Sequence, residues 1–236
     1  EKAKALVKTA ASKIDLKKLL LSTVKNKQAW IWGFYISTLN LSVMLLGALW
    51  GCLFLMQVYG LNKGTASLIT MMIFFGTIVG SPLMGFLSDS LSRRKLPSLF
   101  FSSLSLINLL LIVYMTHWST PMLYILFFTL GFLTSAQIIG YPAISENTPH
   151  EYAGSALGLA SVLIMLLPAI TQPLFGWLMD SHWNGKKING VAQYTLNNFH
   201  HGLMILIVTC IVSMLLVLIS KETFCQSSVH RQNNAV

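Results

Sequence analysis

The sequence contains few charged residues. Asp, Glu, Lys and Arg together make up 10% of the 236 residues, and only 7 of them are acidic. A soluble domain carries about 25% charged residues. Hydrophobic residues make up 54% of the chain, and the mean hydropathy is +0.66. Because so few charges cannot cover a water-exposed surface, the composition excludes a soluble globular domain and indicates that most of the surface contacts lipid.

The sequence patterns that identify several other classes of protein are also absent. The three cysteines have no paired spacing, so we expect neither a disulfide framework nor a metal site. No nucleophile lies in the pattern of a six-span serine protease, so we expect no catalytic residue, no enzyme activity and no cofactor. The net charge of +9 does not predict a nucleic-acid partner, because basic residues in membrane proteins report topology.

Six apolar runs are each long enough to cross a bilayer, which needs about 20 residues per helix. They do not alternate as barrel strands do. We therefore predict an all-α membrane protein with six transmembrane helices. The predicted spans are 29–58, 65–88, 96–116, 121–145, 153–179 and 199–220.

Basic residues predict the orientation of these spans. Thirteen of the sixteen Lys and Arg residues fall on the side that holds both termini, which the positive-inside bias makes cytoplasmic. We expect three segments: a basic cytoplasmic linker (1–28), a six-helix bundle (29–222) and a cytoplasmic tail (223–236). The first residue is Glu1, so we expect a fragment or a processed piece. No signal peptide is visible before residue 28.

The basic linker has two interpretations. Apolar residues share one helical face among its lysines, which is typical of an amphipathic helix on the inner leaflet. A solvated linker remains the alternative. The apolar positions are Val7, Ala10, Ile14 and Leu21.

A short motif occurs twice in the chain. SPLMGFLSDS (81–90) and QPLFGWLMDS (172–181) share the pattern Pro-Leu-x-Gly-x-Leu-x-Asp-Ser. Gly85 matches Gly176, and Asp89 matches Asp180. Each copy closes the second helix of a three-helix set, and the predicted spans put the two copies on opposite membrane faces. The sequence therefore predicts two inverted three-helix repeats, a construction found in many secondary transporters.

The stretch GFLSDSLSRRK (85–95) resembles the loop motif G-x-L-x-D-R/K-x-G-R/K-R/K of the major facilitator superfamily. Ser90 and Ser92 replace the usual basic residue and glycine, as in the weaker copy between helices eight and nine. The resemblance covers essentially residues 1–225. It implies a twelve-helix transporter of which this chain holds helices seven to twelve, in a bacterial inner (plasma) membrane.

The resemblance assigns a gating motif to Gly85, Asp89, Arg93 and Arg94, with Gly176 and Asp180 as its inverted counterpart. A carboxylate at a helix C-terminus needs compensation, which Arg93 and Arg94 can supply through charge-assisted hydrogen bonds. In the family the corresponding Asp also faces a helix N-terminus of the opposite half. The alternative is a local Asp–Arg ion pair that only orders the loop.

Uncharged polar residues are the candidates for a solute cavity, because no Asp, Glu, Lys or Arg falls in the middle of a span. The family lines its cavity largely with the helices that are first and fourth here. Helix–helix hydrogen bonding is the alternative role. The candidates are Asn40, Trp50, Gln57, Thr134, Gln137 and Tyr141.

The sequence thus predicts secondary active transport of a small-molecule solute by rocker-switch alternating access. The expected partners are the lipid bilayer and either an N-terminal six-helix half or a second copy of the chain. A homodimeric half-transporter, a channel or scramblase, and a non-transporting sensor on the same fold remain alternatives.

Overall fold

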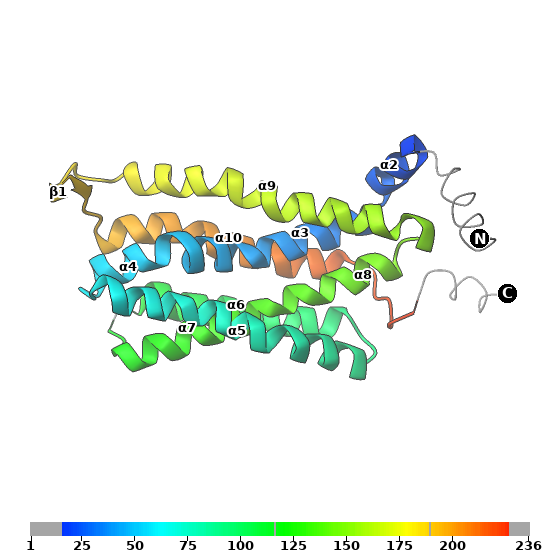
Figure 1. The fold of residues 1–236 in the computed structure, drawn as a ribbon, viewed down its shortest axis with the longest axis horizontal. Coiled ribbons are helices and arrows are strands. Elements are labelled where there is room, and N and C mark those ends of the chain that lie inside the picture. Colours follow the sequence, from blue (N-terminus) through cyan, green and yellow to red (C-terminus); the bar gives the residue numbers. More distant parts are fainter. Residues whose placement is uncertain (1–15, 116, 189, 227–236) are drawn as a thin grey trace, which may run out of the picture.

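The computed structural model describes residues 16–115, 117–188 and 190–226. In this part of the chain, six helical spans are long and apolar enough to cross a membrane, and they run along one common axis (Figure 1). The shortest has 20 residues, about 30 Å at 1.5 Å per residue. The spans are Lys27–Val58, Lys63–Ser90, Lys95–Tyr114, Thr120–Glu146, His150–Asp180 and Leu196–Ile219. They confirm the predicted all-α membrane fold.

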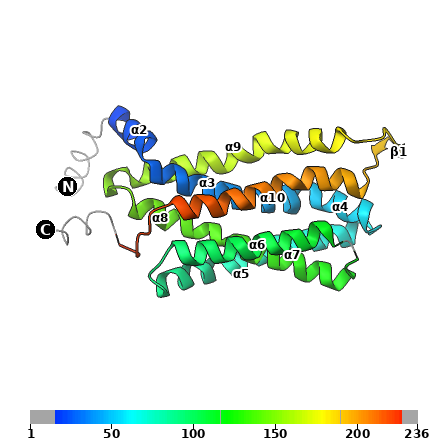
Figure 2. The ribbon, with the colours of Figure 1, turned by 180° about the vertical axis from the view of Figure 1, so that it is seen from behind.

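Four spans are continuous or nearly so. The second, third and sixth are the single helices α5 (Lys63–Ser90), α6 (Lys95–Tyr114) and α10 (Leu196–Ile219). The fifth begins with a short 3₁₀ turn, η3 (His150–Tyr152), and continues as α9 (Ala153–Asp180). Seen from behind, α6 and α10 lie beside one another along the bundle (Figure 2).

The first and fourth spans contain irregular helix in their middle. The first span consists of α3 (Lys27–Ser42), the π-helix η1 (Val43–Trp50) and α4 (Gly51–Val58). The fourth consists of α7 (Thr120–Thr134), the 3₁₀ segment η2 (Ser135–Ile139) and α8 (Gly140–Glu146). Irregular turns inside helices often mark functional sites. These are the two spans expected to line a cavity.

Small residues allow α5 and α7 to pack closely. A Cβ atom on Gly131 would lie 1.9 Å from the Ile73 carbonyl oxygen, and one on Gly76 would lie 2.1 Å from the Phe128 carbonyl oxygen. Such close backbone contact is the usual basis of helix association in lipid. Asn108 adds a hydrogen bond from its Nδ2 to the Leu126 carbonyl at 3.0 Å, which joins α6 to α7.

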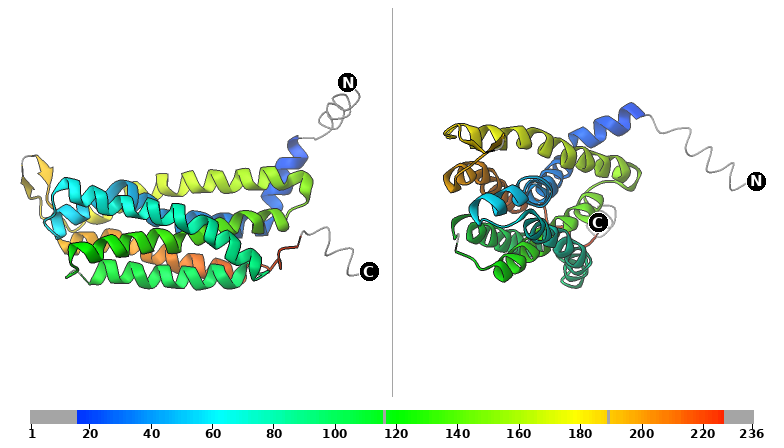
Figure 3. Two further views of the ribbon diagram at one scale, coloured as in Figure 1. Left: turned by 60° about the horizontal axis from the view of Figure 1, so that its bottom comes forward. Right: turned by 60° about the vertical axis from the view of Figure 1, so that its left-hand side comes forward.

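The two ends of the bundle carry different structures (Figure 3). One end holds helix α2 (Leu16–Lys25) and residues 220–226, and we call it the terminal end. The other holds a short hairpin of β1 (Lys187–Ile188) and β2 (Val191–Ala192), and we call it the hairpin end. Helices α5 and α9, which carry the two motif copies, end at opposite ends of the bundle (Figure 1). The copies are therefore inverted, as predicted.

Helix α2 packs at the terminal end beside α9. The Thr23 hydroxyl hydrogen-bonds to Ser155, and Asn26 Nδ2 donates to Thr148 Oγ1 at 2.9 Å. Leu20, Leu21 and Val24 are largely exposed. Of the apolar face predicted for the linker, Val7, Ala10 and Ile14 lie outside the described residues. Its placement on the inner leaflet stays a prediction.

Candidate functional site

The turn after α5 positions the two arginines of the motif. The Arg93 amide donates to the Ser88 carbonyl at 3.2 Å, and the Ser92 amide donates to the Asp89 carbonyl at 3.0 Å. These bonds form a Schellman end, which needs one residue in the left-handed region. Ser92 occupies it with φ 49°, where the family motif usually has glycine. The reversal sends the side chains of Arg93 and Arg94 in different directions.

Arg94 is buried and joins two acidic residues. Its Nη1 donates to Asp89 Oδ1 at 2.6 Å and to Ser88 Oγ at 2.9 Å. Its Nη2 and Nε donate to Glu146 Oε1 at 2.6 and 3.2 Å, and Nε also contacts Oε2 at 3.3 Å. The two carboxylates differ in accessibility: the Asp89 side chain is 66% exposed and that of Glu146 is 13% exposed. Glu146 is therefore the buried partner of Arg94, and Asp89 faces outward.

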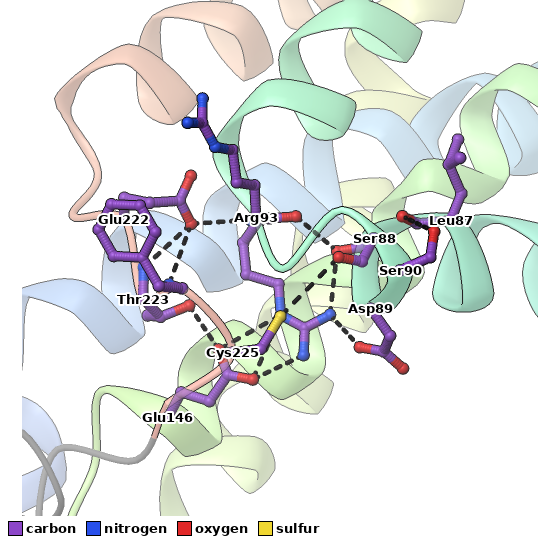
Figure 4. Close-up of polar contacts among 11 residues, drawn as sticks. Leu87, Ser88, Asp89, Ser90, Arg93, Glu146, Glu222, Thr223 and Cys225 are labelled. Carbon is purple, nitrogen blue, oxygen red and sulfur yellow. Dashed lines mark hydrogen bonds and ion pairs between the residues drawn. The ribbon is translucent and has the colours of Figure 1, made fainter.

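The segment after α10 completes this cluster (Figure 4). Buried Thr223 donates its hydroxyl to Glu146 Oε2. Glu222 accepts the first free amides of α6, from Arg94 at 2.7 Å and from Lys95 at 2.9 Å. We call this set the Arg94 network. It comprises Ser88, Asp89, Arg94, Glu146, Glu222 and Thr223, and it joins the ends of α5, α6, α8 and α10.

Hydrogen bonds and nearby charge shift the pKa of two members of the network, Arg94 and Glu222. Burial lowers the pKa of Arg94, but hydrogen bonds and charge from Glu146 and Asp89 outweigh it, so the net shift is upward. Burial raises the pKa of Glu222, but the amides of Arg94, Lys95, Thr223 and Phe224 outweigh it, so this pKa falls below its ordinary value. Arg94 and Glu222 are therefore charged at neutral pH.

The sequence predicted part of this network. Asp89 and Arg94 pair as expected, but among the described residues Arg93 does not contact Asp89; its side chain points away from the cluster (Figure 4). Sequence reasoning missed Glu146, Glu222 and Thr223. A signal was present, since Glu146 and Glu222 are two of only seven acidic residues and each closes or follows an apolar span on the side that holds Arg94.

Two of the cavity candidates meet at the irregular segments. Gln137 in η2 donates its Nε2 to Asn40 Oδ1 in α3 at 3.3 Å. At the residue before Gln137, the Ala136 carbonyl accepts a hydrogen bond from the Tyr35 hydroxyl at 3.0 Å. The 3₁₀ geometry changes the backbone hydrogen bonding of η2, and Tyr35 supplies a partner from the neighbouring span. Polar groups of the first and fourth spans therefore face one another within the bundle.

The other cavity candidates lie apart from this pair. The buried Thr134 hydroxyl donates to the Leu130 carbonyl of its own helix at 2.8 Å. Trp50 stacks on Phe175 of α9 with ring centroids 4.9 Å apart. Gln57 bonds the hairpin end, donating to the Ala192 carbonyl and accepting from the Tyr194 amide, both at 2.9 Å. Tyr141 is half-buried in α8.

The inverted counterpart of the motif has a different partner. Asp180 Oδ1 accepts a hydrogen bond from the Tyr194 hydroxyl at 2.8 Å. Burial first, and then this bond and the charge of Asp180, raise the pKa of Tyr194 to about 12. The motif glycines also differ. A Cβ on Gly85 would meet no described atom within 4 Å, whereas one on Gly176 would lie 3.7 Å from Trp50.

No group of three or more His, Cys, Asp or Glu side chains in the described ranges is placed to hold a metal ion. No curated protein matches the chain. The family model described as Major Facilitator Superfamily matches residues 31–230, which is most of the chain and covers all six spans except the first four residues of the first one. Members of this family are membrane transporters. With its six spans and inverted motif copies, the chain therefore belongs to the major facilitator superfamily.

Proposed function

We propose that the chain is the C-terminal six-helix half of a bacterial transporter that moves a small solute by rocker-switch alternating access. The observation that carries the proposal is the Arg94 network, in which one buried guanidinium ties the end of the second span to the end of the fourth. Such a cluster makes the terminal end of the half move as one body. The excess of basic residues at this end supports a cytoplasmic location for both termini.

Asp89 is the member of the network that is available to a partner half. Its Oδ1 accepts from Arg94, and two-thirds of its side chain is exposed. A carboxylate in this position can accept hydrogen bonds from a helix N-terminus of the other half. In this scheme the Asp89 contact forms when the cytoplasmic side closes and breaks when the halves rock. The Arg94–Glu146 pair persists throughout, because it is buried within this half.

In this proposal the partner half packs on α5 and α9, which expose apolar side chains. Phe75 and Ile78 of α5 and Met165 of α9 are 45%, 68% and 70% exposed. Gly85 leaves open space next to Asp89, so another backbone can approach there closely. The Asn40–Gln137 pair, between the irregular segments of two spans, is our candidate contact for the solute.

Solute flux in vesicles tests the transport proposal. Membrane vesicles containing the intact protein are assayed with radiolabelled hexoses, amino acids and dicarboxylates. We expect saturable flux of at least one solute and a changed rate for Asp89→Asn. Lys221→Gln, which removes an exposed charge from the same end, serves as the control and should leave flux unchanged. Flux equal to that of empty vesicles, or identical flux in Asp89→Asn, would contradict the proposal.

Cysteine labelling tests the gating role without a known solute. Cys225 Sγ lies 3.8 Å from the Ser88 carbonyl oxygen, beside the Arg94 network, and is half-buried. In a Cys52→Ser background we expect a maleimide to modify Cys225 faster in Asp89→Asn than in the parent protein, because the closed state is less populated. Equal labelling rates would contradict the gating role of Asp89.

A further inference from the structure

A cleft of about 340 Å³ opens at the terminal end, between the start of α6 and the end of α10. Glu222 of the Arg94 network lines one side of it. The rest of its walls combine two kinds of side chain. Arg93 and Lys95 contribute positive charge, and Leu96, Leu99, Leu218 and Phe224 contribute apolar surface.

The two cations are placed differently. Arg93 is exposed and projects away from the acidic cluster (Figure 4), and neither ion pair among the described residues includes it. Lys95 Nζ donates to the carbonyls of Leu218 at 2.9 Å and Ser220 at 2.8 Å. An ammonium group has three donors, so one remains. Glu222 is turned toward the amides of α6, so its carboxylate is already hydrogen-bonded.

The apolar wall is largely uncovered. Leu96, Leu218 and Phe224 are 52%, 54% and 53% exposed. Phe224 has φ 51°, a conformation that is costly for a bulky residue. The cleft therefore offers a positive rim beside an apolar surface, at the depth where the spans begin and end.

We infer that this cleft binds an anionic phospholipid of the leaflet at the terminal end, with the phosphate between Arg93 and Lys95 and an acyl chain along Leu96 and Leu218. The inference rests on the membrane orientation in the proposed function, which puts this end at the cytoplasmic leaflet. Basic pockets between transmembrane helices on that side suit anionic headgroups. A free phosphate ion would match the cations but would leave the apolar wall uncovered.

Lipid retention tests the inference. The intact protein is reconstituted in nanodiscs with phosphatidylglycerol or with phosphatidylcholine of the same acyl chains, released into mild detergent, and examined by native mass spectrometry. We expect preferential retention of phosphatidylglycerol. Arg93→Gln should lower that retention about fivefold, since one basic residue at a membrane surface contributes about 1 kcal/mol. Leu218→Gln should lower it as well, through the acyl-chain contact.

Lys221→Gln is the matched control, because it removes a neighbouring charge that does not line the cleft. Its retention of phosphatidylglycerol should equal that of the parent protein. If Lys221→Gln and Arg93→Gln lower the retention of phosphatidylglycerol equally, general electrostatic attraction to the protein surface explains the binding. That result would overturn the inference. Equal retention of phosphatidylglycerol and phosphatidylcholine would also overturn it, as would complete displacement of the bound lipid by free glycerol 3-phosphate. Retention requires no solute flux, so its failure is distinguishable from failure of the transport proposal.

Discussion

Arg94 Nη2 lies 2.6 Å from Glu146 Oε1, although 52 residues separate the two in sequence. The same guanidinium reaches Asp89, so one buried cation joins the ends of α5 and α8. A charge of this kind is stable only while its partners remain, because an uncompensated buried ion is costly. The stability of the terminal end should therefore depend on Arg94 much more than on its neighbour in sequence.

Arg94→Gln and Arg93→Gln form a matched pair that tests this dependence. Loss of Arg94 leaves Glu146 buried without its cation, and breaking such a pair costs about 3–5 kcal/mol. We expect a clearly lower Tm for Arg94→Gln in detergent without added lipid. Arg93→Gln should have a Tm close to that of the parent protein, because Arg93 is exposed and outside the network. Equal Tm values for the two variants would contradict the assigned structural role.

Acid should weaken the cap that Glu222 places on α6. The folded-state pKa of Glu222 is lowered, so its contribution to stability is present above the unfolded value of about 4.3 and is lost as the pH falls through the folded value. Thermal denaturation between pH 7 and pH 3 should show this loss in the parent protein. Glu222→Gln should start from a lower Tm and fall less over the same range. Parallel curves would argue against the cap.

Burial and the Asp180 contact together predict an alkaline titration of Tyr194. The pKa of Tyr194 is raised to about 12, so the associated stabilisation is present below about 10 and is lost as the pH rises through about 12. Asp180→Asn should lower this pKa toward 10 without reaching it, because burial remains. Tyrosinate absorbance, with Tyr194→Phe subtracted to isolate the signal, measures the change. An unchanged titration in Asp180→Asn would mean that burial alone sets this pKa.

Gly131 and Gly85 should respond very differently to alanine. A Cβ on Gly131 would lie 1.9 Å from the Ile73 carbonyl oxygen, so α5 and α7 would have to separate. Overpacking of this kind costs about 1–3 kcal/mol. We expect Gly131→Ala to lower the Tm or the yield of folded protein in size-exclusion chromatography. Gly85→Ala, whose Cβ meets no described atom within 4 Å, is the control. Equal behaviour would contradict close packing of α5 on α7.

Apolar run length predicted the fold well because bilayer thickness constrains it. All six spans match within a few residues, and the Asp89 and Asp180 copies predicted the inversion. The Arg94 network was only half predictable. Asp89 and Arg94 are near in sequence, whereas Glu146 and Thr223 reach them only after four spans have packed. Gln57 also carried a pattern that fits a cavity, but the folded hairpin supplies its partners.

The cap on α6 has a consequence for biosynthesis. The amides of Arg94 and Lys95 are satisfied by Glu222, which follows 128 and 127 residues later in the chain. Thr223, which donates a hydrogen bond to Glu146, lies 77 residues after Glu146 in the sequence. The ribosome therefore synthesises Glu222 and Thr223 only after the last span. Until then the first amides of α6 and the Arg94–Glu146 pair lack these hydrogen-bond partners. Closure of the terminal end is thus timed to the end of translation of this bundle.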